Sequence, residues 1–288
     1  SLTDGDGVDG NLRAVAVNNS VFVTVGTDDL MVSTDGATWT VPVLPSQLDG
    51  GEARWIGNSL VYNSGYFYMG VQETIESLGF ILRTDDATNW QATNAGSVTP
   101  PGLPSSNTVA QFASDGANNL MGISTSDPTK YYYSTDAGST FSLTSNGLDS
   151  YSEFNKGITF NSVSNQFVVA GSQDGDEESA AVIDDASLGG SLNDIAANLG
   201  GSVTDIVTLP TVNGEYFIAQ SSGVVHRLNN DFQAGYDESH HSFFGDVVRM
   251  VIAGDYVYAV MSTGVIIRKR IVSDTSKLST VDLSFTPA

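Results

Sequence analysis

The sequence predicts an all-β protein made of repeated four-stranded units, and three observations lead to this fold class. Short apolar runs alternate with turns of Asn, Ser, Gly and Asp along the chain. A central run of apolar and aromatic residues recurs six times, at steps of 45, 53, 47, 49 and 40 residues. No window longer than about ten residues carries the apolar stripe of a helix. Radially repeated units of four strands predict a single β-propeller of six blades, and five or seven blades would mean that eroded repeats are miscounted.

The six central runs place one strand in each repeat. They are VFVTVG (21–26), YFYMG (66–70), LMGIS (120–124), QFVVAG (166–171), EYFIAQ (215–220) and YVYAV (256–260). The first repeat shows a whole unit, with strands expected at Arg13–Val17, Val21–Val25, Leu30–Ser33 and Thr38–Val43. The nearest approach to a helical pattern, Leu192–Leu199, is short and falls where a fourth strand is due.

Composition narrows the possible functions. The chain has 288 residues, 40% of them apolar, which is enough for an ordered core. It has no Cys, so disulfides, thiolate metal sites and a cysteine nucleophile are excluded. Its net charge of −22 would repel phosphate backbones and anionic lipid, so we expect no nucleic-acid or membrane-surface role. The apolar runs are too short to cross a bilayer. The acidity suits a saline setting or serves solubility alone.

These patterns divide the chain into an acidic N-terminal segment (1–10), a six-bladed propeller (11–272) and a C-terminal strand or tail (273–288). The chain opens without Met or a signal peptide, which predicts a processed, trimmed or mature chain. The run KLSTVDLSFTPA either completes the last blade or docks on a neighbouring subunit.

A turn motif recurs with nearly the same period. STDGATWT carries Asp35, RTDDATNW carries Asp85, STDAGSTF carries Asp136, and a worn copy, IDDASLGG, carries Asp185; the steps are 50, 51 and 49 residues. An Asp inside a turn accepts hydrogen bonds from the backbone N–H groups ahead of it, and Gly supplies a backbone conformation that other residues avoid. The closing Trp or Phe is expected to bury its ring between neighbouring sheets.

The motif Ser-x-Asp-x-Gly-x-Thr-Trp is the Asp-box, and the chain resembles the Asp-box (BNR-like) β-propellers, closest in style to phage and bacterial surface propellers. That group includes sialidases, sortilin-type receptors and photosystem assembly factors. The third copy has the full spacing, the first is one residue short, and the second has Arg83 for Ser and Ala87 for Gly. The resemblance implies that the box is a peripheral hairpin staple, so we expect its Asp residues to be structural.

Loop lengths distinguish two faces of the predicted propeller. Connections between first and second strands are short, whereas the connections of the opposite face carry insertions, among them 44–58, 94–107 and 144–156. The elaborated face is the functional candidate, since binding sites usually lie on loops carried by a rigid scaffold. Its acids could hold calcium, contact a basic partner or simply be solvated. They are Asp28, Asp29, Glu73, Glu76, Asp127, Asp174, Asp176, Glu177 and Glu178.

Four smaller groups of residues have both a functional and a purely structural interpretation. Asp4, Asp6 and Asp9 could ligate calcium or belong to a mobile terminus. Tyr131–Tyr133 could stack on sugars, but packing between blades is favoured. The loop with His240, His241, Phe243 and Phe244 has three interpretations. A two-His metal site is disfavoured, because adjacent side chains of an extended chain point to opposite sides. The loop could instead contact another protein, or its two Phe residues could lie in the core. Arg268–Arg270 is the only basic run and is interpreted as a local salt-bridge patch.

The possibility that the chain is an enzyme is examined by comparison with the sialidases, which share the Asp-box. Their chemistry needs three converging Arg residues, a Tyr nucleophile beside a Glu, and an Asp acid/base. Seven Arg residues are present, but none stands in an Arg-Ile-Pro motif. No GxSxG, HExxH, P-loop or dinucleotide fingerprint occurs. No catalytic, cofactor or metal residue is therefore assigned, and calcium is the one ion considered.

The predicted function is a non-enzymatic structural or interaction module, in a virion (tail, fibre or decoration protein) or at an extracellular surface. The alternative is a secreted glycan-binding protein or sialidase-like glycoside hydrolase. A third hypothesis is an assembly factor like those of photosystems. The expected partners are subunits of an assembly, a cell-surface receptor or a glycan, without nucleic acid or membrane insertion.

Overall fold

The computed structural model describes residues 12–271 except 19, 28, 44–54, 74–78, 96–107, 125–126, 128–129, 146–152, 174–176, 185–192, 196–201, 210–213, 222, 230–233 and 241–244. The predicted segments 1–10 and 273–288 lie outside the described residues. The chain divides into two compact units, Ser1–Asn146 (unit 1) and Gly147–Ala288 (unit 2).

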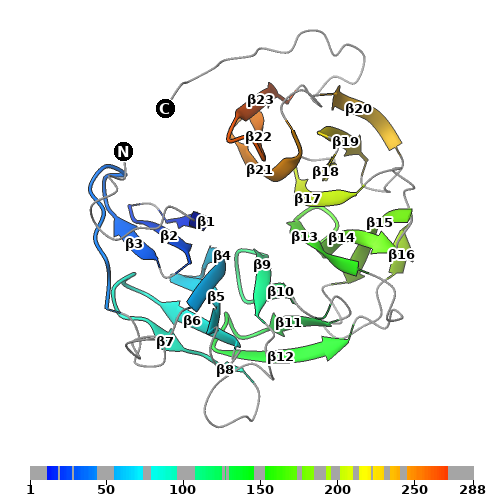
Figure 1. The fold of residues 1–288 in the computed structure, drawn as a ribbon. Coiled ribbons are helices and arrows are strands. Elements are labelled where there is room, and N and C mark those ends of the chain that lie inside the picture. Colours follow the sequence, from blue (N-terminus) through cyan, green and yellow to red (C-terminus); the bar gives the residue numbers. More distant parts are fainter. Residues whose placement is uncertain are drawn as a thin grey trace. The chain divides into compact units, whose positions relative to one another are not determined.

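Unit 1 has three sheets among its described residues, and their strands are antiparallel except for β8 (Figure 1). Sheet 1 contains β1 (Leu12–Val17), β2 (Phe22–Gly26) and β3 (Leu30–Ser33). Sheet 2 contains β4 (Trp55–Asn63), β5 (Tyr66–Glu73), β6 (Gly79–Thr84) and β7 (Gln91–Ala92). Sheet 3 contains β9 (Val109–Ser114), β10 (Leu120–Ser124), β11 (Lys130–Ser134) and β12 (Thr140–Ser145), with the short β8 (Asn94–Ala95) pairing in parallel with β12.

Unit 2 repeats this arrangement. Sheet 4 contains β13 (Glu153–Asn161), β14 (Gln166–Gln173), β15 (Glu177–Asp184) and β16 (Asn193–Ile195). Sheet 5 contains β17 (Val203–Thr208), β18 (Tyr216–Gln220), β19 (Val224–Leu228) and β20 (Ala234–His240). Sheet 6 contains β21 (Val247–Ala253), β22 (Tyr256–Met261) and β23 (Ile266–Arg270).

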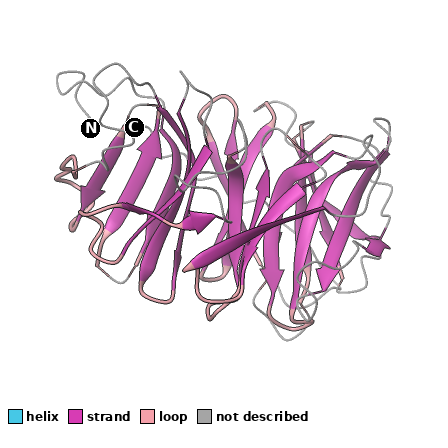
Figure 2. Cartoon of the chain, turned by 90° about the horizontal axis from the view of Figure 1, so that it is seen from below, coloured by secondary structure: helices cyan, strands magenta, loops and turns pink. Residues whose placement is uncertain are grey.

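The all-β prediction is confirmed for the described part of the chain. The six central runs form the second strands β2, β5, β10, β14, β18 and β22. The segment with a weak helical pattern contains the fourth strand of its sheet, β16. Figure 2 shows strands and loops but no helix among the described residues, and none of these residues belongs to a helix that could span a membrane.

The fourth strand predicted at Thr38–Val43 is wrong as a continuous strand. Only two isolated bridges form there, an antiparallel one between Thr40 and Val32 and a parallel one between Val43 and Asn89. Pro42 explains the interruption, because proline has no N–H to donate to a strand ladder. The segment therefore begins on sheet 1 and passes to sheet 2, as β8 passes from sheet 2 to sheet 3.

The short connections between first and second strands follow ordinary turn chemistry. Ser64 and Gly65 join β4 to β5 with φ values of 48° and 90°. Two positive φ values in a two-residue hairpin are typical of a type I′ turn, whose twist matches that of the strands. In sheet 3, Asp115 Oδ1 instead accepts hydrogen bonds from the N–H groups of Ala117 and Asn119.

The core of each unit lies between neighbouring sheets. In unit 1, Val23 and Leu30 of sheet 1 pack with Phe67 and Leu82 of sheet 2. Sheets 2 and 3 enclose a second cluster, which includes Tyr68, Phe112, Tyr132 and Phe141. Unit 2 has the same arrangement, with one cluster between sheets 4 and 5 and another between sheets 5 and 6. Burial between faces of successive sheets is the main stabilising contribution in this architecture.

Polar contacts join the sheets at the ends of β4 and β13. Asn63 Nδ2 donates to the carbonyl of Ala117, in the first hairpin of sheet 3, at 3.0 Å. Asn161 Nδ2 donates to the carbonyl of Gly214, in the corresponding connection of sheet 5, also at 3.0 Å. Both Asn residues directly follow a residue that pairs with the central Phe of the sheet, Phe67 or Phe167. The two units therefore use the same inter-sheet contact.

Candidate functional site

The first strand of every sheet has a β-bulge or an irregular register near its N-terminal end. The interruptions lie between Leu12 and Ala14, Gly57 and Ser59, Val109 and Gln111, Glu153 and Gly157, Val203 and Asp205, and Val247 and Arg249. A bulge bends a strand and re-aims the side chains beside it, and bulges are common next to functional sites. This end of the first strands adjoins the sheet-to-sheet connections, which belong to the elaborated face of the sequence prediction.

In unit 1, the bulged ends carry an apolar residue and an arginine. Leu12 is 37% exposed, and the exposed Arg13 is the bulge residue of β1. Its Nη1 donates a 3.1 Å hydrogen bond to Oδ1 of Asn58, the bulge residue of β4. The bond fixes the guanidinium at the edge of two sheets while other N–H groups of the side chain stay accessible.

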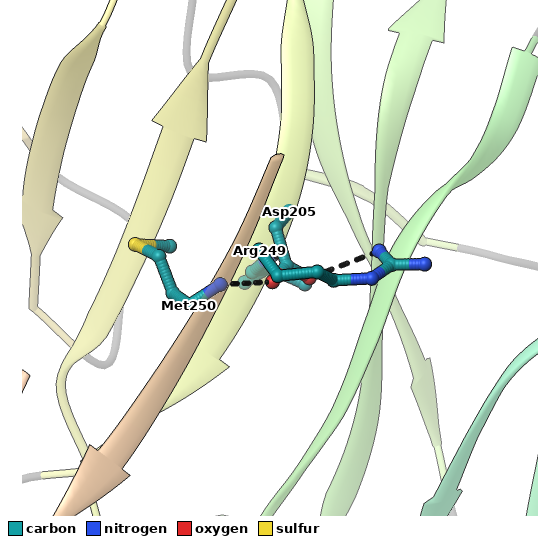
Figure 3. Close-up of polar contacts among 4 residues, drawn as sticks. Asp205, Arg249 and Met250 are labelled. Atoms are coloured by element: carbon teal, nitrogen blue, oxygen red, sulfur yellow. Dashed lines mark hydrogen bonds and ion pairs between the residues drawn. The ribbon is translucent and has the colours of Figure 1, made fainter. Parts of the chain in front are cut away.

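In unit 2, the first residue after the bulge of β17 is a buried carboxylate, Asp205, which is 1% exposed. Figure 3 shows its contacts with Arg249 and Met250. Its Oδ2 accepts a 2.7 Å hydrogen bond from the N–H of Met250, and its Oδ1 accepts one of 2.9 Å from Ile206. Arg249 Nη1 lies 3.7 Å from Oδ1, and the Arg249 side chain is 41% exposed. Two backbone donors and a guanidinium therefore offset the cost of burying this charge.

Arg249 and its neighbour Val248 repeat the combination seen in unit 1. Val248 is the bulge residue of β21 and is 47% exposed. Each unit thus presents an exposed aliphatic side chain beside a guanidinium held by a neighbouring sheet. Arginine with apolar surface is the composition favoured at the centre of protein interfaces, and a guanidinium can bind a carboxylate in bidentate fashion. Across the described ranges, no group of three or more His, Asp or Glu residues could hold a metal ion.

The first box, Ser33–Trp39, has the hydrogen bonds expected of a structural staple. Asp35 Oδ1 accepts from the N–H groups of Ala37 and Thr38, at 2.8 and 2.7 Å, and from the Ser33 hydroxyl at 3.0 Å. The Thr38 and Ala37 bonds, with that of Ser33, lower the pKa of Asp35 to about 2. All three bonds lie within the turn.

The second box corrects the sequence alignment, because its central acid is Asp86 and not Asp85. Asp86 Oδ1 accepts from Thr84 Oγ1 and from the N–H groups of Thr88 and Asn89, at 2.7–2.8 Å. Asn89, with Thr88 and Thr84, holds the pKa of Asp86 far below its usual range. Thr84 thus replaces Ser, and the box begins one residue later than the Arg83 alignment placed it. Two adjacent Asp residues made the sequence ambiguous.

The third box, Ser134–Phe141, is seated on sheet 2. The Tyr68 hydroxyl donates to the carbonyl of Ala137, and Arg83 Nη1 contacts Ser139 Oγ at 3.3 Å. The Phe141 ring meets the Tyr68 ring edge-on, with centroids 6.3 Å apart. Burial raises the pKa of the Tyr68 hydroxyl, so it stays a donor. The prediction that the closing aromatic lies between sheets is confirmed for Phe141.

The closing aromatics of the other two boxes differ from each other. Trp90 is buried in the cluster between sheets 1 and 2, as predicted. Trp39, which closes the first box, is only half-buried. The worn fourth box follows Asp184, and its remaining residues, 185–190, lie outside the described ranges.

Two of the smaller candidate groups, the tyrosine run and the basic run, have structural roles in the described part of the chain. Tyr131 and Tyr132 are 3% and 1% exposed, and Tyr132 belongs to the cluster between sheets 2 and 3, so these two rings cannot stack on a sugar. In the basic run, the Arg268 guanidinium carbon lies 5.0 Å from the centroid of the Tyr256 ring. Arg270 lies 4.0 Å from Asp255, both largely exposed. The run is therefore a local patch, as predicted.

Several predicted sites cannot be placed. Three groups lie outside the described residues. They are the N-terminal acids Asp4, Asp6 and Asp9; the loop 241–244, with His241, Phe243 and Phe244; and the loop acids Asp28, Glu76, Asp174 and Asp176. His240 ends β20, and Glu177 and Glu178 begin β15, but only their backbone is described. Two of the remaining acids, Asp29 and Glu73, are buried, and Asp127 forms a 3.2 Å ion pair with Lys130.

The bulged ends were missed by sequence reasoning. Bulges leave no composition signal, because any residue type can be the extra one. Asp205 did offer a signal: it interrupts the apolar strand VTDIVT, and a charge in such a strand usually has a buried partner.

Comparison with known proteins identifies the fold. The sequence matches no protein-family model and no curated protein. The structure of YCF48 bound to D1 peptide matches 91% of this chain and 78% of its own, with a TM-score of 0.63 and 14% identity. The WD40 β-propeller domain of Doa1 matches 90% of this chain and 78% of its own, with a TM-score of 0.62 and 10% identity. The fold is a β-propeller. BBS1N in complex with ARL6DN matches 88% of this chain and 76% of its own, with a TM-score of 0.59 and 10% identity.

Proposed function

We propose that the six sheets are the blades of one β-propeller, which serves as a non-enzymatic module that binds other protein subunits. The observation that carries the binding role is the pairing of exposed aliphatic and arginine side chains at the bulged ends of the first strands. Leu12 with Arg13 and Val248 with Arg249 form this set, named here the bulge-end face. Basic side chains are few in this chain, with 11 Lys and Arg residues against 33 Asp and Glu residues.

The chemistry of the bulge-end face favours a partner segment with acidic and apolar side chains. Arg13 and Arg249 are each held by a polar group of the neighbouring sheet, so little side-chain entropy is lost when a carboxylate binds. The aliphatic side chains supply area that association would remove from water. Two of the similar structures are complexes, YCF48 bound to D1 peptide and BBS1N in complex with ARL6DN, which supports a polypeptide as partner.

The setting we propose is a virion or an extracellular surface, with the chain as a tail, fibre, decoration or surface component. Its Cys-free, strongly acidic composition is compatible with such a particle. The third Asp-box, which joins sheets 2 and 3 through the buried Phe141 ring and the Tyr68 hydrogen bond, and the buried Trp90 of the second box give the rigidity that a structural component needs. The resemblance to phage and bacterial surface propellers supports the same setting.

Site-specific photocrosslinking in the native assembly tests the binding role. A benzophenone amino acid would replace Leu12 or Val248, and Val163 would be the matched control. Val163 is an exposed aliphatic residue, 45% accessible, in the hairpin at the other end of sheet 4. We expect adducts with another subunit from positions 12 and 248 and none from 163. Adducts from 163 alone, or from none of the three, would contradict the proposal.

The glycan-binding and glycosidase alternative is tested on the purified protein. Sialyllactose and a glycan array are suitable probes, because the sialidases are the relevant comparison for the box. The proposal predicts neither hydrolysis nor specific retention. Release of sialic acid, or retention that is lost on replacing Arg13 or Arg249, would replace the protein-binding proposal with the glycan one.

A further inference from the structure

The connection from β1 to β2 contains the motif Asn-x-Ser, with Asn18 and Ser20 as its first and last residues. Asn-x-Ser or Asn-x-Thr, with any residue except proline in the middle, is the acceptor sequence for N-linked glycosylation. The chain has 19 Asn residues, and Asn18 is the only one with Ser or Thr two positions later. A motif this short also arises by chance, so the surroundings of the side-chain amide decide whether it can carry a glycan.

Asn18 holds the same place in sheet 1 as the inter-sheet asparagines Asn63 and Asn161 hold in sheets 2 and 4. Each of the three directly follows a residue that pairs with the central Phe of its sheet. For Asn18 that pair is Val17 with Phe22. The three side-chain amides can therefore be compared position by position.

The side-chain oxygen has the same role in sheets 1 and 4. Asn18 Oδ1 accepts hydrogen bonds from the N–H groups of Ser20 and Val21, at 2.9 and 2.7 Å. Asn161 Oδ1 accepts from the N–H of Val163, again two residues ahead, at 2.9 Å. These bonds hold the turn and use only the oxygen of the amide.

The side-chain nitrogen distinguishes Asn18 from the other two. Asn63 and Asn161, which are 2% and 0% exposed, use Nδ2 to donate to the carbonyls of Ala117 and Gly214 in the next sheet. Asn18 is only half-buried, and its Nδ2 has no hydrogen-bond partner among the described residues. The neighbouring hairpin of sheet 2 has two residues between its strands, whereas both acceptor carbonyls lie in longer connections. The motif thus coincides with the one amide of the three whose nitrogen is available.

We propose that Asn18 is an N-glycosylation site. In the transfer, Nδ2 attacks C1 of a sugar carried by a lipid-linked phosphate donor, and it loses one proton to the transferase. The bond between Nδ2 and C1 forms, the bond between C1 and the phosphate oxygen breaks, and the lipid phosphate leaves. Oδ1 keeps its two backbone hydrogen bonds, so the folded turn carries the glycan without rearrangement.

The position of the glycan is compatible with the binding role of the bulge-end face. Leu12 begins β1 and Val17 ends it, so Asn18 and Leu12 lie at opposite ends of the same strand. A glycan on Asn18 covers the hairpin end of sheet 1 and leaves the bulge-end face open to a partner subunit. The inference rests on the extracellular setting proposed above and does not depend on the identity of the partner.

Glycopeptide mass spectrometry of the protein isolated from its native assembly tests the site directly. Trypsin would cleave after Arg13 and Arg54 and release residues 14–54, in which Asn18 and Asn19 are the only Asn residues. Peptide N-glycosidase in heavy-oxygen water converts a glycosylated Asn into labelled Asp. We expect the label at position 18 and none at position 19. A peptide that is unmodified at Asn18 would overturn the proposal.

Secretion of the full-length chain from yeast, behind a cleavable signal, tests the structural argument. Ser20→Ala removes the acceptor hydroxyl but keeps the backbone N–H that bonds to Asn18, and Ser20→Thr retains the motif. We expect one glycan on the parent and on Ser20→Thr, and none on Ser20→Ala, with equal melting temperatures after enzymatic deglycosylation. A parent chain secreted without a glycan would count against the site.

Val163→Thr completes the same motif at the buried Asn161, and Val163→Ala is its matched control. Because a glycan on Asn161 Nδ2 has no room beside Gly214, we expect the secreted yield of Val163→Thr to fall several-fold below that of Val163→Ala. The protein that is secreted should carry its glycan at Asn18 alone. Full modification of Asn161 at an undiminished yield would show that the inter-sheet bond does not decide which amide is used, and would overturn the argument.

The glycosylation inference and the binding proposal fail separately. An unmodified Asn18 in a native assembly that gives adducts from positions 12 and 248 would overturn the glycosylation inference alone. A glycan on Asn18 without those adducts would overturn the binding role alone.

Discussion

Asp205 and Met250 join two neighbouring first strands through a buried hydrogen bond of 2.7 Å from the Met250 N–H to Asp205 Oδ2. Asp205 is the first residue after the bulge of β17, and Ser59 holds the same register position in β4. Ser59 Oγ donates to the carbonyl of Val109 in the next first strand, at 2.9 Å. A side chain at this position therefore reaches the adjacent sheet in both units.

Replacing Asp205 is predicted to cost more than replacing Arg249. Asp205→Asn leaves one acceptor oxygen for two backbone donors and should lower the free energy of unfolding by about 1–3 kcal/mol. Arg249→Ala removes a long, partly exposed ion pair and should cost about 1 kcal/mol or less. Urea denaturation at pH 7 measures both. Equal losses would show that the ion pair, rather than the backbone donors, holds the carboxylate.

Gly138→Ala is predicted to destabilise unit 1 strongly. A Cβ at position 138 would lie 2.2 Å from the Tyr68 ring, and φ is +77°. Gly116→Ala is the matched control, since φ is +80° there and nothing lies within 4 Å. The control should lose about 1–2 kcal/mol from backbone strain, and Gly138→Ala about 1–3 kcal/mol more from the clash. Similar losses in the two variants would mean that the third box is not seated on Tyr68.

Removing the inter-sheet asparagines should cost stability in both units. Asn63→Ala removes the donor to Ala117 and the acceptor of the 2.6 Å bond from Ser114 Oγ. Asn161→Ala removes the donor to Gly214 and the acceptor of the Val163 N–H. Each loss should be about 1–3 kcal/mol, because buried groups are left unsatisfied. Ser114→Ala, which removes one bond only, should cost less than Asn63→Ala in the same thermal melts.

Low pH should destabilise the first box, because Asp35 becomes protonated. Its folded pKa, about 2, lies below the usual 3.8, so the folded state binds fewer protons than the unfolded state between these values. The stabilisation is complete above pH 4 or so and is lost as the pH falls towards 2. Asp35→Asn cannot ionise, so melting temperatures of variant and parent should converge near pH 2. The same difference at pH 7 and pH 2 would contradict this role.

The sequence was sufficient to predict the repeats, because hydrophobic alternation and turn residues are local signals. It located the central strands correctly, and it assigned correctly the structural role of the Asp residues in the first and third boxes. It misaligned the second box at Asp85, since two adjacent acids fit the same motif and only the hydrogen bonds of Asp86 distinguish them. It also extended the first sheet through Pro42, where the missing N–H interrupts pairing.

The bulge-end face could not be predicted, because it depends on the register of paired strands. A bulge is a relation between two strands, and neither strand shows it alone.

The binding role of the bulge-end face is tested most directly by a cryo-EM structure of the protein in its native assembly. The account predicts another subunit against the bulge-end face, with its carboxylates at Arg13 or Arg249 and its apolar side chains on Leu12 or Val248. A structure in which that face is open to solvent, with a sugar held by converging Arg and Tyr side chains elsewhere, would contradict it.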